Sequence, residues 1–325
     1  TQSRSSAASD VYKRQVYGLL EQKYFYEDGE CKMKNNKITI VSSCNDAFAE
    51  HVSALFVSVL ENTDRSTKLF DFYVIDDEIS IANKRLMRET LKEYDAMLHF
   101  LTIDKKYFSD AVESERIPET AYYRIAIPEL FSDQNLERIL YLDCDMIALG
   151  DISELWEIDL SDYTLAAVED AGFHHRLEKM DIACSSTKYF NSGFMLINME
   201  KWLTGNVTKR VMQFIHDNPE KLKFHDQDAL NAILHDQWLQ LHPKWNAQSY
   251  IMKREVEHPD PEGEKEYFET RRDPKIIHYS GHVKPWSPEF TSSLKKYYEE
   301  YEELTAFTDE EEVSAAKASS TRKLG

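Results

Sequence analysis

The sequence predicts an α/β fold in which a mainly parallel central sheet is flanked by helices on both faces. Short β-branched runs alternate with amphipathic segments, which is the pattern of parallel strands joined by helical crossovers. The 325 residues are 42% hydrophobic and include only 9 Gly and 9 Pro, a composition typical of a globular protein with a sizeable core. No run approaches the ~18 apolar residues that a membrane-spanning helix needs.

Each expected element follows from its own residue pattern. The runs that we expect to be strands are residues 38–43, 69–75, 97–101, 138–142, 164–168 and 194–198, with a short strand at 276–277. The segments that we expect to be helices are residues 49–60, 80–94, 201–216 and 227–234, and residues 289–305 are an acidic helix candidate. Ligands of such folds bind at the carboxyl ends of the strands, so the residues directly after each strand are the first candidates for function.

We expect one folded domain at residues 36–288, followed by a C-terminal helix within 289–307. Residues 1–35 are expected to be non-native or disordered, because their opening string TQSRSSAASDVYKRQ lacks hydrophobic periodicity and resembles translated cloning sequence. Residues 308–325 are small and polar without a pattern, which indicates a disordered tail.

Charge and cysteine content narrow the partners and the compartment. With 39 Lys and Arg against 58 Asp and Glu, the formal charge is −19, which disfavours nucleic acid and makes contact with anionic membrane doubtful. An anionic ligand then needs a metal, a few placed cations or backbone N–H groups. The four cysteines, Cys31, Cys44, Cys144 and Cys184, form no CxxC pair, so we expect reduced thiols and a cytoplasmic protein without a signal peptide.

The sharpest motif is YLDCDMI, in which a predicted strand runs directly into Asp143 and Asp145. At positions i and i+2 of an extended chain, both carboxylates project to the same side and can share one hard cation. A chain this acidic has other pairs at that spacing, so spacing alone is weak. Two charges at the buried end of a strand are costly without a compensating cation, which favours a metal or phosphate role over a solvated turn.

A second segment, HYSGHVKPW, begins at His278 directly after a short predicted strand. A histidine beside two carboxylates makes a mixed nitrogen and oxygen donor set, which accepts Mn²⁺ more readily than Mg²⁺. On its own, a lone histidine is more often a core residue. Gly281 allows close approach of a ligand to the backbone, and Lys284 supplies a mobile charge suited to phosphate. The segment is expected to complete a diphosphate site.

Two further pairs carry groups that bind sugars. Asn191 and Ser192 precede a predicted strand, and Asp226 and Gln227 begin a predicted helix. Carboxylates and amides directed into a cleft bind sugar hydroxyls, and the Gln227 oxygen can face a developing positive charge. The alternative is a helix cap formed by Asp226 or Asp228.

Arg124 lies within the apolar segment YYRIAIPELF, where a guanidinium needs a carboxylate or phosphate partner. It could orient the aspartates or touch a phosphate. After the first strand, Asn45 or Asp46 could hydrogen-bond to the edge of a base and Phe48 could stack on it, although Asp46 could equally cap the following helix.

Taken in order, five motifs resemble glycosyltransferase family 8, the bacterial lipopolysaccharide-type galactosyl- and glucosyltransferases that share a fold with glycogenin. The motifs are YYRIAIPELF, RILYLDCDMIALGDISELW, YFNSGFMLINMEKW, HDQDALN and HYSGHVKPW. The resemblance implies a GT-A fold and a UDP-hexose donor, with Mn²⁺ as cofactor and Mg²⁺ as the alternative. It also implies transfer of glucose or galactose, with retention of configuration, to a glycan, lipopolysaccharide or other cell-surface polysaccharide or glycolipid.

The resemblance also implies roles at the matching positions. Mn²⁺ would bridge the diphosphate to Asp143, Asp145 and His278. The residues that would contact the donor are Asn45, Phe48, Arg124, Asp143, Cys144, Asn191, Ser192, Gly281 and Lys284. Asp170, Asp226 and Gln227 would surround the sugar as the catalytic group, with Gln227 nearest the anomeric carbon. The base-binding turn departs from the family pattern of an Asp, a second acid, an Asn and a Tyr, because Asn45 replaces the Asp, Ala47 replaces the Asn and Phe48 replaces the Tyr.

Other functions fit parts of the same pattern. A non-catalytic nucleotide-sugar or glycan-binding module would keep the fold without turnover, and self-glucosylation on a tyrosine stays open. An Asp-x-Asp phosphatase is disfavoured because Ile147 stands where that class has Thr or Val. Residues 172–189 are long and polar, so we expect a mobile loop that covers the donor and shapes the acceptor site.

Overall fold

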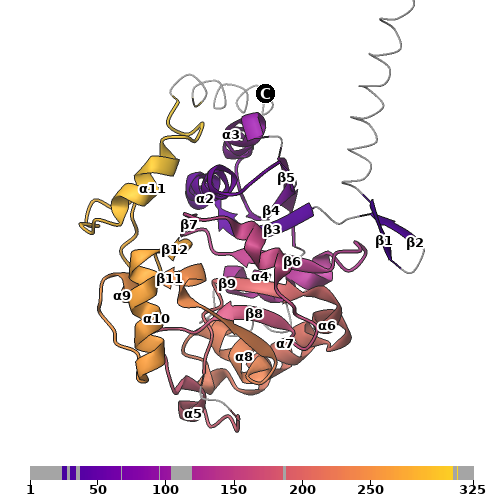
Figure 1. Ribbon diagram of the computed structural model, residues 1–325, viewed down its shortest axis with the longest axis vertical. Helices are drawn as coiled ribbons and strands as arrows, with labels where there is room; N and C mark the ends of the chain where they lie inside the picture. Colours follow the sequence, from indigo (N-terminus) through magenta and orange to yellow (C-terminus); the bar gives the residue numbers. More distant parts are fainter. Residues whose placement is uncertain are drawn as a thin grey trace, which may run out of the picture.

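The computed structural model describes residues 24–27, 30–33, 37–66, 68–94, 96–103, 119–185, 188–309 and 313 (Figure 1). A seven-stranded sheet with the order β10-β8-β9-β6-β3-β4-β5 forms its centre. The strands are β3 Lys37–Asn45, β4 Leu69–Asp77, β5 Met97–Leu101, β6 Arg138–Leu142, β8 Leu165–Val168, β9 Phe194–Asn198 and β10 Trp238–Leu241. Within this sheet β9 alone runs antiparallel to its neighbours, which confirms the mainly parallel sheet.

Helices cover both faces of this sheet. They are α2 Ala49–Asn62, α3 Ile81–Leu91, α4 Glu119–Leu130, α5 Arg176–Lys179, α6 Met199–Thr204, α7 Val207–Asp217, α8 His225–Leu234, α9 Ser249–Met252, α10 Pro261–Arg272 and α11 Lys295–Glu302. Successive side chains of β6 alternate between two cores: Leu140 packs in the core of α2 and α11, and Tyr141 packs in the core of α4 and α6 to α8. The sheet is therefore buried on both faces, as parallel sheets are.

A second sheet of three short strands lies beside the main one. It has the order β11-β12-β7, from β11 Ala247–Gln248, β12 Ile276–His278 and β7 Met146–Ala148. Strand β12 pairs antiparallel with β7, so that His278 lies opposite Met146. This pairing joins the chain just after β6 to a segment about 130 residues later.

Several elements differ from their predicted form. The helix expected over residues 201–216 is two helices, α6 and α7, because the chain turns at Gly205 and at Asn206, which has a positive φ of 48°. The C-terminal helix is shorter than expected, since α11 covers Lys295–Glu302. The strand β10 pairs parallel with β8 and was not expected, since its residues WLQL include no β-branched side chain.

The ends of the chain are described in part. Tyr24–Glu27 (β1) and Glu30–Met33 (β2) form an antiparallel hairpin where we expected no regular structure. The rest of residues 1–35, and all of the expected C-terminal tail except residues 308, 309 and 313, lie outside the described residues. None of the described helices is long and apolar enough to cross a membrane. Cys44, Cys144 and Cys184 are free thiols, and a cytoplasmic location stays a prediction.

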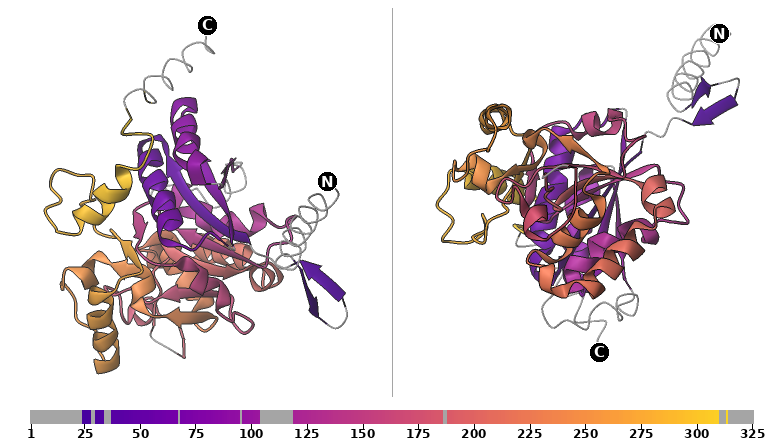
Figure 2. Two further views of the ribbon diagram at one scale, coloured as in Figure 1. Left: turned by 45° about the horizontal axis from the view of Figure 1, so that its top comes forward. Right: turned by 90° about the horizontal axis from the view of Figure 1, so that it is seen from below.

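Helix α11 lies beside α2 (Figures 1 and 2), and an aromatic cluster attaches the two helices. The His51 imidazole stacks on Trp286 with ring centroids 3.6 Å apart, and its Nδ1 lies 2.6 Å from the hydroxyl of Tyr298 on α11. The side chain of Phe48 packs edge-on against both His51 and Trp286. Burial disfavours the charged imidazole and lowers the pKa of His51 to about 4.

Acid is expected to weaken this attachment. Unfolded histidine titrates near pH 6.5, so the unfolded chain takes up this proton first as the pH falls. The stability that depends on neutral His51 is intact above about pH 6.5 and is lost toward pH 4, by about 3 kcal/mol in total. Urea unfolding at pH 7 and pH 4.5 should show a smaller pH effect in His51→Gln than in the wild type. The control is His216→Gln at an exposed position of α7, and an unchanged pH effect in His51→Gln would refute the interpretation.

Candidate functional site

The predicted metal ligands converge at the carboxyl edge of the sheet. Asp143 and Asp145 leave β6 and lead into β7, and the antiparallel pairing of β7 with β12 brings His278 beside them. One ligand atom from each of the three side chains lies within 4.8 Å of the others. The Asp145 and His278 side chains are buried, at 10% and 5% exposed, and the Asp143 side chain is 23% exposed. The arrangement places two carboxylates and one imidazole around a common point.

Lys284 and His278 both contact the Asp145 carboxylate. The Lys284 ammonium lies 2.5 Å from its Oδ2 and donates to the Tyr279 carbonyl at 2.8 Å, and His278 Nε2 lies 3.3 Å from its Oδ1. Burial alone would raise the pKa of Asp145, but His278 and Lys284 outweigh it and hold that pKa well below its usual range. Asp145 therefore stays a carboxylate, the form that a cation binds.

A chain of side-chain amides orients the His278 ring. The Asp170 carboxylate accepts from Asn191 Nδ2 at 2.9 Å, and Asn191 Oδ1 accepts from Asn246 Nδ2 at 2.9 Å. Asn246 Oδ1 then lies 2.9 Å from His278 Nδ1 and can only accept. The hydrogen of the neutral ring is therefore on Nδ1, and the lone pair of Nε2 faces Asp145. Asn246 is a site residue that sequence reasoning missed.

Removal of this amide is expected to weaken cation binding at the site. In Asn246→Leu nothing accepts from Nδ1, so the ring is free to adopt the other tautomer, and Mn²⁺ affinity should fall by roughly 10- to 100-fold. Asn246→Asp keeps an acceptor for Nδ1 and should recover much of that loss. Electron paramagnetic resonance of free Mn²⁺ gives the dissociation constants. Equal affinity in the leucine variant and the wild type would contradict the role of Asn246.

Asp143 is fixed by three groups. Its Oδ1 accepts from the Tyr141 hydroxyl at 2.7 Å and lies 3.1 Å from Arg124 Nη2, and its backbone N–H donates to the Gly193 carbonyl at 2.8 Å. Gly193 leaves no room for a side chain, because a Cβ there would lie 2.5 Å from Asp143 Oδ2 and 2.8 Å from His278 Cε1. The sequence motif contained this glycine, but its role depends on a contact with β12 that no local pattern reveals.

Arg124 has the predicted carboxylate partners. Besides Asp143, its Nε lies 3.0 Å from Asp226 Oδ2, and its Nη1 donates to Ser192 Oγ at 3.1 Å. Burial would lower the pKa of this guanidinium, but the charges of Asp143 and Asp226 raise it above its usual value. Burial in turn raises the pKa of Asp226, while Arg124 opposes that rise. The arginine thus connects the two halves of the site.

Gln227 is held more firmly than the sequence indicated. Its Nε2 donates to Asp170 Oδ2 at 3.0 Å, and its Oε1 accepts from the Ser192 backbone N–H at 3.0 Å. Asp170 also accepts from the Gly172 N–H at 3.0 Å. Asp170, Asn191, Ser192 and Gln227 therefore form one hydrogen-bonded group next to the metal-ligand cluster.

Asp226 and Asp228 have different tasks. Asp226 faces Arg124, whereas the fully buried Asp228 accepts from the backbone N–H groups of Lys223 and Phe224 at 2.7 and 2.8 Å. The capping alternative is wrong, because α8 begins at His225 after Phe224 and neither aspartate caps it. Asp228 also pairs with Arg176 Nη2 at 2.7 Å. This ion pair fastens α5, and with it the predicted mobile cover at residues 172–189, to the start of α8.

The predicted base-binding turn follows β3 at the same edge of the sheet as β6. Asn45 Oδ1 accepts from the Ala47 N–H at 3.1 Å, so Asn45 caps the short 3₁₀ turn Asp46–Phe48. The expectation that Asp46 caps the next helix is wrong, because its carboxylate instead accepts from the Ser80 N–H at 2.8 Å.

Two other residues that were predicted to contact the nucleotide-sugar donor, Cys144 and Gly281, lie in loops at the carboxyl edge of the sheet. Cys144, between the two aspartates, packs partly buried against the main core, and burial raises the pKa of its thiol. Gly281 borders open space, with nothing within 4 Å of the position of an added Cβ.

Comparisons with known proteins agree with the fold. Residues 39–289 match the model of "Glycosyl transferase family 8". General stress protein A of Bacillus subtilis is 44% identical over 277 residues, which cover 85% of this chain and 95% of that protein. A lipopolysaccharide 1,2-glucosyltransferase of Escherichia coli is 30% identical, over 70% of this chain and 67% of that protein.

Among solved structures, the galactosyltransferase LgtC in complex with donor and acceptor sugar analogs is similar. It has a TM-score of 0.71 at 23% identity, over 82% of this chain and 96% of that chain. The fold and the family match thus define a glycosyltransferase of the GT-A type. The chain belongs to glycosyltransferase family 8, and its relatives support the transfer of a hexose.

Proposed function

We propose that the protein transfers glucose or galactose from a UDP-sugar to a glycan, lipopolysaccharide or other cell-surface polysaccharide, with Mn²⁺ and with retention of configuration. The observation that carries the proposal is the arrangement of Asp143, Asp145 and His278 at the edge of the sheet. Names of relatives support the hexose and the class of acceptor, since they include a lipopolysaccharide 1,2-glucosyltransferase and a lipopolysaccharide 1,3-galactosyltransferase.

The residues present fit a divalent cation. Two carboxylate oxygens and one imidazole nitrogen are a donor set that suits Mn²⁺, with Mg²⁺ as the alternative. The Nε2 lone pair of His278 and the Asp145 Oδ1 face each other at 3.3 Å, an arrangement that a shared cation stabilises. The bare backbone of Gly193 keeps the space between Asp143 and His278 free of a side chain.

Cationic groups at this edge fit a leaving diphosphate. When bound, the cation would supply Lewis-acid stabilisation of the negative charge that develops on the leaving diphosphate. Lys284 brings a flexible ammonium to the same carboxylate and can neutralise a phosphate oxygen. Arg124 keeps Asp143 and Asp226 in position through charge-assisted contacts of about 3 Å. Gly281 leaves the loop backbone accessible to a phosphate.

The hydrogen-bonded group around Asp170 fits the sugar. A hexose that loses its leaving group develops positive charge at the anomeric carbon, which nearby carboxylates and amide oxygens stabilise. Asp170 and Asp226 supply such carboxylates, and two hydrogen bonds hold the Gln227 amide in one orientation. Retention, which the family resemblance supports, would follow if the acceptor hydroxyl attacks from the face that the leaving group vacates.

A donor panel tests the proposal. Purified protein is offered UDP-glucose, UDP-galactose, UDP-N-acetylglucosamine and GDP-mannose with Mn²⁺ or with a chelator, and release of the nucleoside diphosphate is measured. We expect release from one UDP-hexose, dependent on the cation, and an α-anomer by NMR when an acceptor is supplied. Binding of a nucleotide sugar without any turnover would favour the binding module. Neither binding nor release from any donor would contradict the proposal.

A further inference from the structure

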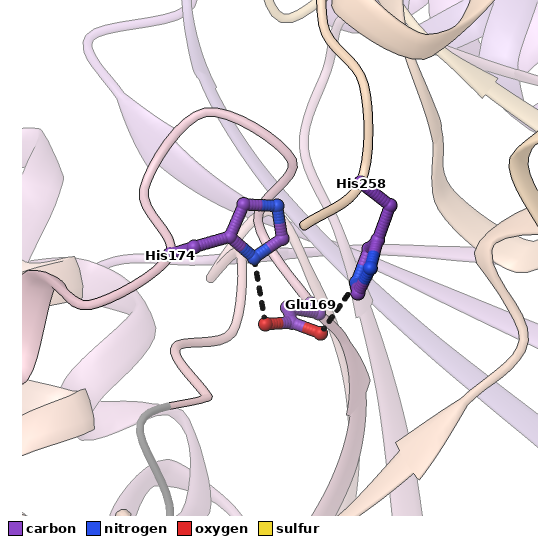
Figure 3. A group of neighbouring side chains, drawn as sticks. All are labelled: Glu169, His174 and His258. Carbon is purple, nitrogen blue, oxygen red and sulfur yellow. Dashed lines mark hydrogen bonds and ion pairs between the residues drawn. The ribbon is translucent and has the colours of Figure 1, made fainter. Parts of the chain in front are cut away.

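A second cluster of metal-binding side chains lies outside the site described above. Glu169 follows β8, His174 precedes α5, and His258 lies in the turn before α10, and these three side chains point toward one another (Figure 3). Glu169 Oε1 lies 2.9 Å from His174 Nδ1, and Oε2 lies 3.5 Å from His258 Nε2. One ligand atom from each residue lies within 4.8 Å of the others. The cluster shares no residue with the Asp143, Asp145 and His278 group.

The charge of this cluster is incompletely balanced. The Glu169 side chain is only 9% exposed, and among the described residues its ion-pair partners within 4.0 Å are the two imidazoles, with no Lys or Arg. A further donor, Gln240 Nε2, is at 3.5 Å. His174 Nε2 is buried and has no hydrogen-bond partner in the described part of the chain. A buried carboxylate without a permanent counter-charge is costly, and a bound cation would remove that cost.

The surroundings of His258 suit a metal-bound ring. Its Nδ1 lies 3.1 Å from the Asp260 backbone nitrogen, 3.2 Å from the Asp260 carbonyl oxygen and 3.3 Å from Asp260 Oδ2. In the tautomer with the hydrogen on Nδ1, that hydrogen is donated to one of these oxygens and the Nε2 lone pair is directed at Glu169, which is how protein groups orient a ligating histidine. In the other tautomer Nδ1 accepts from the Asp260 N–H. The ring also packs on the bare backbone of Gly263 at the start of α10, where a Cβ would lie 2.2 Å from Nδ1.

We propose that Glu169, His174 and His258 bind a second divalent ion, of the zinc class. Two imidazoles and one carboxylate suit Zn²⁺ and Co²⁺ better than Mg²⁺ or Ca²⁺, and three protein ligands leave a fourth position for water. The ion joins three segments that are separate in sequence: the end of β8, the start of the 172–189 segment and the turn before α10. It lies beside Asp170, the next residue after Glu169. The proposal does not depend on the transferase function.

Cobalt titration of the metal-stripped full-length chain tests this site. Co²⁺ in a four-coordinate site gives an intense visible absorption band, so the wild type should show such a band and bind one equivalent at this site. His174→Gln and His258→Gln should lose the band and bind Co²⁺ at least 100-fold more weakly there. Asp145→Asn, which alters the other cluster, should keep it. The matched control is His242→Gln, because the His242 imidazole of the wild type also faces a glutamate, at 3.1 Å from Glu269. This variant should keep the band.

A gain-of-signal variant guards against a folding artefact. His174→Cys keeps a metal ligand but adds a thiolate, so its Co²⁺ complex should show a new sulfur-to-cobalt charge-transfer band in the near ultraviolet. Circular dichroism of each metal-free variant confirms the fold. The proposal is overturned if the wild type shows no four-coordinate band, if the glutamine variants keep it, or if the cysteine variant binds Co²⁺ without the new band.

Discussion

An Asp145→Asn protein is expected to release UDP from its hexose donor at least ~10³-fold more slowly than the wild type, at any Mn²⁺ concentration that can be tested. The substitution removes the carboxylate charge at the centre of the site while it preserves the shape of the side chain. It also leaves the Lys284 ammonium facing a neutral amide, which makes the site more positive and repels a divalent cation further. The measurement is the initial rate of UDP release across a Mn²⁺ titration.

The control for Asp145→Asn makes the same Asp-to-Asn replacement at a residue outside the site. Asp162→Asn, at an exposed turn before β8, should release UDP at the wild-type rate. Thermal unfolding in chelator shows whether both variants are folded. If folded Asp145→Asn retained more than a tenth of the wild-type rate, the assignment of Asp145 as a cation ligand would be wrong.

A Gly193→Ala protein is expected to lose Mn²⁺ affinity by about 10- to 100-fold, although no ligand atom is removed. The added methyl would lie 2.5 Å from Asp143 Oδ2 and 2.8 Å from the His278 ring, both closer than a carbon atom can approach. Asp143 cannot move aside without loss of its contacts with Tyr141 and Arg124. Overpacking of this kind costs roughly 1–3 kcal/mol. The strain displaces the Asp143 and His278 side chains from the positions in which they bind the cation.

Calorimetric titration of Mn²⁺ measures this effect, with Gly172→Ala as the matched substitution. There an added methyl would be 3.6 Å from the nearest atom, an ordinary contact, so affinity should stay within about twofold of the wild type. Wild-type affinity in Gly193→Ala would show that the space between Asp143 and His278 is not where the cation binds.

The fold could be predicted where strands are continuous apolar runs. Strands β3, β4 and β6 are β-branched or aromatic and buried on both faces, so their pattern was readable. The three-residue strands β7 and β12 are set by their mutual pairing, which a local pattern reveals only in part. Helix α10, PEGEKEYFETRR, was not predicted because few of its residues are buried and its charges hide the helical period.

The site residues could be predicted where a functional side chain lies at or directly after the end of a predicted strand. Asp143, Asp145 and His278 were each predicted because they lie at or directly after the end of a strand, and the family resemblance joined them as one ligand set; the antiparallel pairing of β12 with β7 brings them together. Asn246 was missed because its role depends on an amide chain to Asn191, 55 positions earlier, and no local motif marks it. The cluster around His258 was missed for the same reason, since its partners come from two other segments.

Calorimetric titration of UDP into the wild-type protein tests the central claim most directly, because it reports on the diphosphate site without an acceptor. With Mn²⁺ present we expect one UDP to bind per chain, and in chelator we expect the affinity to fall by at least 100-fold, as it should in Asp145→Asn with Mn²⁺ present. Equal UDP affinity with and without a divalent cation, or no binding under either condition, would contradict the proposal that Asp143, Asp145 and His278 hold a nucleotide-sugar diphosphate through a metal ion.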